Sequence, residues 1–78
     1  MTVEVFAPKE IDGKKFTFRS NLKVGTAAHE AAVAFGYPKD TKATFKHGKK
    51  VLDADKTLEE SHVHDGEKLE LVDTGGGV

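Results

Sequence analysis

Hydrophobic and polar residues alternate in the first stretches of the chain, and each such stretch predicts a β-strand. Within residues 2–7, Val3 and Val5 share one side of an extended chain and Thr2 and Glu4 the other, although Phe6 breaks the strict alternation. Phe16 and Phe18 alternate with polar neighbours in the same way. The Asp-Gly pair between the two stretches is typical of a turn. We therefore expect an N-terminal β-hairpin.

The pattern then changes to one that predicts a helix. Residues 27–36 read AAHEAAVAFG, and alanine has the strongest helix propensity of all residues. Thr26 is expected to cap the start of the helix, and Gly36 to stop it. Val33 and Phe35 are its expected large apolar anchors near the end of the helix. Because the remaining apolar positions are alanines, we expect the helix to approach a sheet closely.

The second half of the chain returns to strand signals. Ala43 and Phe45 share one parity in the stretch KATFK, and His47 with Gly48 is expected to form a tight turn into a short strand. A polar connection follows, with a helical turn expected after Thr57. The stretch EKLELV, residues 67–72, predicts the final strand. The order is two strands, one helix and three strands, in a single domain.

Composition narrows the possible functions. With 78 residues, the chain is near the lower limit for a single hydrophobic core, and this argues against an elaborate catalytic cleft. Its 12 basic and 13 acidic residues nearly cancel, so no global field attracts nucleic acid or an anionic membrane. The lack of cysteine excludes disulfides and thiolate metal sites. No leader or membrane-spanning stretch is recognised, so we expect a cytoplasmic location without membrane contact.

The order and spacing of these elements resemble ubiquitin and its relatives. The match rests mainly on residues 43–72, which read ATFKHGKKVLDADKTLEESHVHDGEKLELV, and on GYP at 36–38. The resemblance implies an α+β fold of the β-grasp type, ββαββ(β), in which a mixed sheet packs on one helix. It divides the chain into a domain, residues 1–73, and a flexible glycine-rich tail, residues 74–78. The distance from ubiquitin points to a prokaryotic member.

The glycine-rich tail is the basis of our expectation about the function of the protein. In ubiquitin-like modifiers, a terminal Gly-Gly threads the channel of an E1-like adenylating enzyme, which needs residues without a Cβ. By resemblance, Gly75, Gly76 and Gly77 would supply this arm, and the chain would be joined to amines of protein targets without being an enzyme itself. A processing peptidase would remove Val78 by cutting after Gly77, or would cut after Gly76. A glycine-rich end that is merely frayed remains the simpler alternative.

The resemblance also marks a possible recognition surface. Thr44 is placed where ubiquitin has the central isoleucine of its apolar patch, Val72 retains a valine, and His47 lies beside them. Lys49 follows the turn glycine, as a chain-forming lysine of ubiquitin does. With eleven lysines in the chain, a solvated charge is the favoured interpretation of Lys49.

Two other functions of the same fold stay open. A sulfur carrier would convert the glycine carboxylate into a thiocarboxylate, although such carriers normally end on Gly-Gly, and Val78 counts against this. A non-covalent interaction domain would leave the tail inert and retain Val78.

The sequence does not favour metal binding, a catalytic triad or nucleic-acid binding. His62, His64 and Asp65 include metal-binding residue types, but no third firm ligand is evident, and we expect no metal and no cofactor. Ser61 cannot form a catalytic triad with neighbours on the same short loop, because triads draw on separated elements. The basic stretch KATFKHGKK does not predict nucleic-acid binding, since Phe45 is expected in the core.

Overall fold

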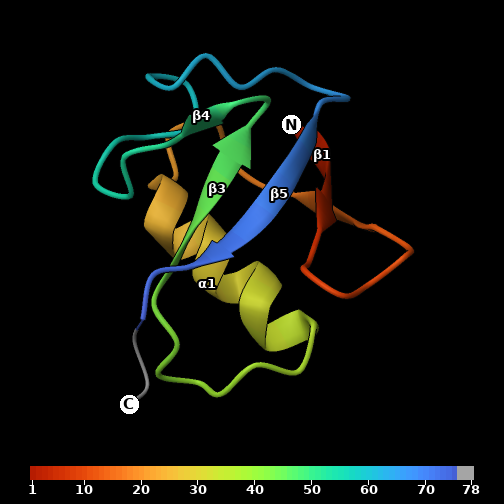
Figure 1. Ribbon diagram of the computed structural model, residues 1–78. Coiled ribbons are helices and arrows are strands. Elements are labelled where there is room, and N and C mark those ends of the chain that lie inside the picture. The colour runs from red at the N-terminus through yellow and green to blue at the C-terminus, as the bar shows by residue number, and fades with distance from the viewer. Residues whose placement is uncertain (76–78) are drawn as a thin grey trace.

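The computed structural model describes residues 1–75, which form one five-stranded sheet and one helix (Figure 1). The elements are β1 (Thr2–Phe6), β2 (Lys14–Thr17), α1 (Val24–Ala34), β3 (Ala43–His47), β4 (Lys50–Val51) and β5 (Lys68–Asp73). The strand order in the sheet is β2-β1-β5-β3-β4. The expected α+β architecture and the expected order of elements are both confirmed.

β5 lies in the middle of the sheet, between β1 and β3 (Figure 1). It runs parallel to β1, where Leu69 is paired with Val5, and antiparallel to β3, where Leu71 is paired with Phe45. These four side chains are at most 2% exposed. Because side chains alternate between the faces of a strand, they all belong to the face that packs on α1. The alternation in the sequence therefore predicted the core face correctly.

α1 packs across that face of the sheet (Figure 1). The residues that it buries there are largely alanines. Ala27, Ala28, Ala31 and Ala32 are completely buried. A methyl group is the smallest side chain that still excludes water, so the helix axis can come close to the sheet. Val33 differs from expectation, because it is 40% exposed and points away from this contact. Phe35 packs against the core from its edge, as expected.

The start of α1 differs from the sequence prediction. The helix begins at Val24, two residues before Thr26, and Lys23 at the cap position makes no side-chain capping bond. Its first amides are instead satisfied by backbone carbonyls of a distant loop: Val24 N donates to Lys56 O (2.8 Å) and Gly25 N donates to Ala54 O (2.9 Å). No local capping residue is needed, because this loop accepts the hydrogen bonds that a cap would accept.

Gly36 ends the helix as predicted. Its φ is +92°, a left-handed conformation that glycine adopts without strain. Gly36 N donates to Val33 O (3.0 Å) and Tyr37 N donates to Ala32 O (2.9 Å). This pair of bonds is the Schellman motif, which satisfies the last carbonyls of a helix.

Two connections refine the expectations for the second half. His47 is the last residue of β3 instead of a turn residue, and the two-residue turn is Gly48–Lys49. The helical turn after Thr57 is closed by a reciprocal pair of bonds: Thr57 N donates to Glu60 Oε1 (2.9 Å), and Glu60 N donates to Thr57 Oγ1 (3.0 Å). This is the capping-box arrangement.

Within the described part of the chain, no helix could cross a lipid bilayer. α1 has 11 residues, and a spanning helix needs about 20.

The alanine surface of α1 makes a stability prediction. Ala31→Leu adds volume at a fully buried position, so we expect the free energy of unfolding to fall by about 1–3 kcal/mol, the usual cost of overpacking. The matched control is Ala34→Leu, the same change at an exposed position of the same helix, with an expected effect within about 0.5 kcal/mol. Urea denaturation of the two variants measures the difference. Equal stability of both variants would contradict the close packing.

Candidate conjugation arm and recognition face

The chain leaves the sheet at the end of β5 through two hydrogen bonds. Thr74 N donates to Lys42 O (2.9 Å), which extends the pairing of β5 with the β3 side by one step. Gly75 N donates to the Asp73 carboxylate at Oδ1 (2.8 Å), and the φ of Gly75 is +91°. The backbone is therefore still held to the domain at residue 75. Three residues of the expected arm, Gly76, Gly77 and Val78, lie outside the described residues.

The face of the sheet opposite α1 is largely polar. The strand register determines which side chains are neighbours on this face. Glu70 is paired with Phe6 on one side and with Lys46 on the other, and Glu4 is paired with Lys68. Charges of opposite sign thus alternate across the central strands. We name this surface the outer face.

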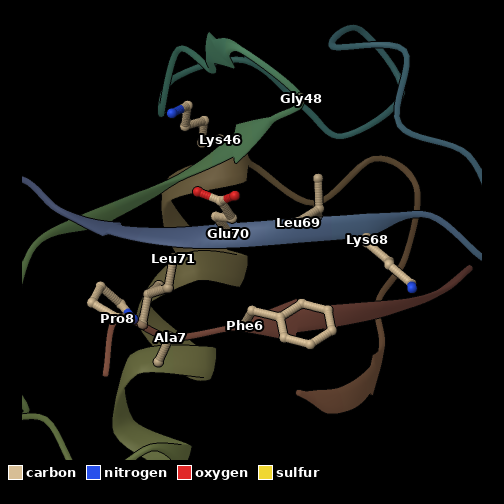
Figure 2. Close-up of a pocket in the computed structure, with 9 residues that line it drawn as sticks. All are labelled: Phe6, Ala7, Pro8, Lys46, Gly48, Lys68, Leu69, Glu70 and Leu71. Carbon is tan, nitrogen blue, oxygen red and sulfur yellow. The ribbon is translucent and has the colours of Figure 1, made fainter. Parts of the chain in front are cut away.

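A groove with a volume of about 650 Å³ crosses the outer face. Figure 2 shows it lying over β5, with Phe6 on the β1 side and Lys46 on the β3 side. Pro8 and Gly48 lie at its ends, where the chain turns away from the sheet, and Glu70 rises from β5 between the walls. The groove therefore combines an apolar wall, a basic wall and an acidic floor. It can accept a side chain that is partly apolar and carries a polar end.

Thr44 was expected on an exposed recognition surface, but the structure places it in a buried position. It is only 3% exposed, and its hydroxyl donates to Leu52 O (2.8 Å). The segment after β4 covers it, so Thr44 itself presents almost no surface to a partner. Val72, paired with Thr44, is half-buried, and Lys49 is exposed in the β3–β4 turn. Recognition through Val72 and chain formation at Lys49 stay predictions.

His47 joins a cluster that the sequence does not reveal. Its ring nitrogen Nε2 contacts the carboxylate of Glu67, and both side chains are 29% exposed. The same carboxylate accepts a hydrogen bond from His64 N (2.7 Å). Glu67 therefore ties the end of β3 to the loop that leads into β5. The two residues are twenty positions apart, and no local pattern pairs them.

This cluster lowers the pKa of Glu67. Burial is the largest single effect and raises the pKa, because it disfavours the charged carboxylate. The hydrogen bonds from the His64 amide and the His47 ring, together with the positive charge of the two imidazoles, outweigh it. The pKa of Glu67 is held below its usual range as a result.

The other candidate residues have structural surroundings. Asp65 accepts a hydrogen bond from Thr2 N (2.6 Å), and His62 and His64 are exposed. Among residues 1–75, no group of three or more His, Cys, Asp or Glu side chains lies close enough to hold a metal ion. Phe45 is completely buried, so its predicted place in the core is confirmed.

Sequence reasoning missed the residues that line the groove. Phe6 breaks the alternation of β1, and Lys46 and Glu70 are ordinary polar positions of strands. Only the register places Glu70 between them. The one available signal was Phe6, an aromatic residue on the polar parity of its strand.

The lowered pKa of Glu67 makes a pH-dependent prediction. The charged carboxylate stabilises the fold fully above the ordinary glutamate pKa of about 4.3, and this contribution is lost as the pH falls through the lower pKa of the folded state. Glu67→Gln is therefore expected to lower the free energy of unfolding at pH 7 by about 0.5 kcal/mol, the order found for partly exposed charged pairs.

Urea denaturation of the native chain and of Glu67→Gln at neutral and acidic pH measures this effect. The stability difference should shrink below a pH of about 4. Glu59→Gln, at an exposed carboxylate, is the matched control and should show no such convergence. A difference that stays constant with pH would show that the charge of Glu67 contributes nothing.

No protein-family model and no curated protein matches the sequence. Solved structures do match. The ubiquitin of Caldiarchaeum subterraneum is 22% identical with a TM-score of 0.79, over 100% of this chain and 98% of that one. The N-terminal ubiquitin-like domain of the 4931431F19Rik protein is 18% identical with a TM-score of 0.78, over 100% of this chain and 78% of that one.

A third match, described as "Molecular Mimicry of SUMO promotes DNA repair", is 10% identical with a TM-score of 0.79 over 92% of this chain and 89% of that one. At such low identities, the likeness concerns the fold. The chain therefore has the ubiquitin-like β-grasp fold that its sequence predicts.

Proposed function

We propose that this chain is a ubiquitin-like protein modifier of prokaryotic type, joined through a glycine carboxylate to amines of target proteins. In this role the domain is not an enzyme but a substrate of enzymes in the cytoplasm. Its partners are a processing peptidase that cuts after Gly77, an E1-like adenylating enzyme and the target proteins.

The observation that carries the proposal is the position of the glycines relative to the fold. They follow β5, the central strand of a ubiquitin-like sheet, after one residue, Thr74, and the first of them, Gly75, is exposed at the surface. A carboxylate on a short arm of this kind can enter an active site that the folded domain cannot enter. Glycine also adopts backbone angles that other residues avoid, which suits a narrow channel.

The proposed chemistry needs only that carboxylate from this chain. It attacks the α-phosphorus of ATP and releases pyrophosphate, which leaves an acyl-adenylate on the arm. A thiolate of the activating machinery displaces AMP and forms a thioester. The amine of a target then displaces the thiolate and forms an amide bond, losing one proton. No side chain of the domain takes part in these steps.

The outer face supplies a surface by which partners can distinguish this domain. Lys46 on one wall of the groove lies next to Glu70 on its floor, and Phe6 offers apolar contact on the other wall. Such alternating charge suits selective recognition, because a wrongly charged partner is repelled. The buried position of Thr44 supports receptors that differ from those reading an apolar patch.

The test is to express the chain with an N-terminal affinity tag in its cell of origin and to analyse captured material by mass spectrometry. We expect a free form that ends at Gly77 and covalent adducts with other proteins. Trypsin cuts after Lys68, so a modified lysine should carry the remnant LELVDTGGG, residues 69–77. Gly77→Ala should abolish these adducts, and Glu30→Ala, at an exposed helix position, should retain them.

Other outcomes would overturn the proposal in recognisable ways. A processed chain that gains the mass difference between one sulfur and one oxygen atom, without adducts, identifies a sulfur carrier. A chain that keeps Val78 and binds proteins only reversibly identifies a non-covalent interaction domain.

A further inference from the structure

We propose that the Asp12–Gly13 bond, in the loop between β1 and β2, is a site of spontaneous isoaspartate formation, and that the fold protects the identical pair Asp65–Gly66 from the same reaction. These are the two Asp-Gly pairs in the sequence. Both belong to the folded domain, so their chemistry does not depend on the proposed modifier function.

Aspartate followed by glycine is prone to this reaction, because glycine has no Cβ to hinder the approach of its amide nitrogen. The nitrogen of Gly13 attacks the side-chain carboxyl carbon of Asp12, and its proton leaves with the carboxyl hydroxyl as water, so that a cyclic imide forms. Water then adds to one of the two imide carbonyls. Addition at the side-chain carbonyl restores aspartate, and addition at the main-chain carbonyl gives isoaspartate. The water taken up replaces the water lost, and no oxidant, reductant or enzyme is needed.

The amide of Gly13 points toward the free edge of the sheet. Met1 N donates to Phe18 O and Phe18 N donates to Met1 O, both at 2.8 Å, so this opposed pair is hydrogen-bonded. Opposed residues of antiparallel strands alternate between bonded and non-bonded pairs, and Val5 with Lys14 is therefore again a bonded pair. The preceding amide, that of Gly13, consequently points away from β1, on the side where β2 is the outermost strand. Among residues 1–75, no backbone carbonyl accepts a hydrogen bond from it.

The side chain of Asp12 is also accessible. It is exposed, and together with Gly13 it borders a surface hollow of about 350 Å³. Water therefore reaches both the carboxyl group and an imide formed from it.

The second pair, Asp65–Gly66, has both reacting groups held by β1. Gly66 N donates to Thr2 O (2.7 Å), and the Asp65 carboxylate accepts a hydrogen bond from Thr2 N (2.6 Å). Exposure does not distinguish the two pairs, because Asp65 and Gly66 are exposed as well. The Gly66 amide can attack only after this loop has opened locally, and the reaction is slowed because only the open fraction of molecules reacts.

Isoaspartate at position 12 also alters the groove on the outer face. Its main chain passes through the former side-chain methylene, so the backbone gains one carbon atom before Gly13. A Cβ built on Gly13 would lie 2.9 Å from Glu4 Cγ and 2.9 Å from two ring atoms of Phe6, which shows how closely this glycine is fitted. A displaced Gly13 therefore moves against Phe6, the apolar wall of the groove (Figure 2). The glycine that this contact favours is the same residue that makes the bond reactive.

Incubation of the full chain in water enriched in the heavy oxygen isotope tests the proposal, because every passage through the imide incorporates one heavy oxygen atom. Trypsin, used afterwards in ordinary water, places the two pairs in separate peptides, residues 10–14 and 57–68. Each labelling rate is compared with that of the same sequence as a free peptide, which corrects for neighbouring residues. We expect residues 10–14 to label nearly as fast as their free peptide. Residues 57–68 should label at least about fivefold more slowly than theirs, the effect of one ordinary hydrogen bond that must open first.

The consequence for the groove is measured by NMR of the Phe6 ring during the same incubation. A second set of Phe6 signals should grow in step with isoaspartate, which chromatography against synthetic peptides quantifies. Asp12→Glu is the matched control, because it keeps the charge while its longer side chain forms the corresponding ring far more slowly. Its Phe6 signals should stay constant.

Three results would overturn these assignments. Labelling of residues 10–14 that is slowed as much as that of residues 57–68 would show that the β1–β2 loop holds the Gly13 amide in solution. Labelling of residues 57–68 at the rate of their free peptide would show that the bonds to Thr2 give no protection. Isoaspartate formation without a change at Phe6 would separate the reaction from the groove.

Discussion

Backbone hydrogen bonds along both edges of β5 hold the two ends of the chain in one sheet. β5 is paired with β1 on one side and with β3 on the other, and it thereby joins the β1–β2 hairpin to β3 and β4. The central position of β5 also places the groove, the core leucines and the glycine-rich end of the chain. β5 forms the floor of the groove, its core-facing leucines pack under α1, and its end delivers the glycines from the centre of the sheet.

The helix α1 packs against both the sheet and the loop at residues 54–56. Completely buried alanines allow α1 to lie close to the sheet. The loop at residues 54–56 meets the first turn of α1, where a Cβ on Gly25 would lie 3.0 Å from that of Ala54. A side chain at position 25 would therefore require Ala54 to shift by a few tenths of an ångström, and Ala54 lies in a loop almost thirty residues later in the chain.

Sequence reasoning predicted the features that local patterns determine. The alternation in β1 and β5 predicted the core face, and Gly36 predicted the end of α1, because each feature depends on residues that are close together in the sequence. The start of α1 was missed since its amides are satisfied by Ala54 and Lys56, which carry no local signal. Thr44 has the parity of the outer face, but the segment at Leu52 covers it. The groove and the His47–Glu67 contact likewise exist only through tertiary register.

The distant capping of α1 also bears on how the protein is made. A ribosome releases the N-terminal half first, but the helix in that half has no acceptor for its first amides until residues 54–56 emerge. β1 gains its central neighbour only with residues 68–70. Long-range pairings of this kind are slow to form, and partial chains keep their apolar faces exposed. The domain thus becomes a stable unit only once synthesis has passed β5, and its glycine arm is the segment that follows at once.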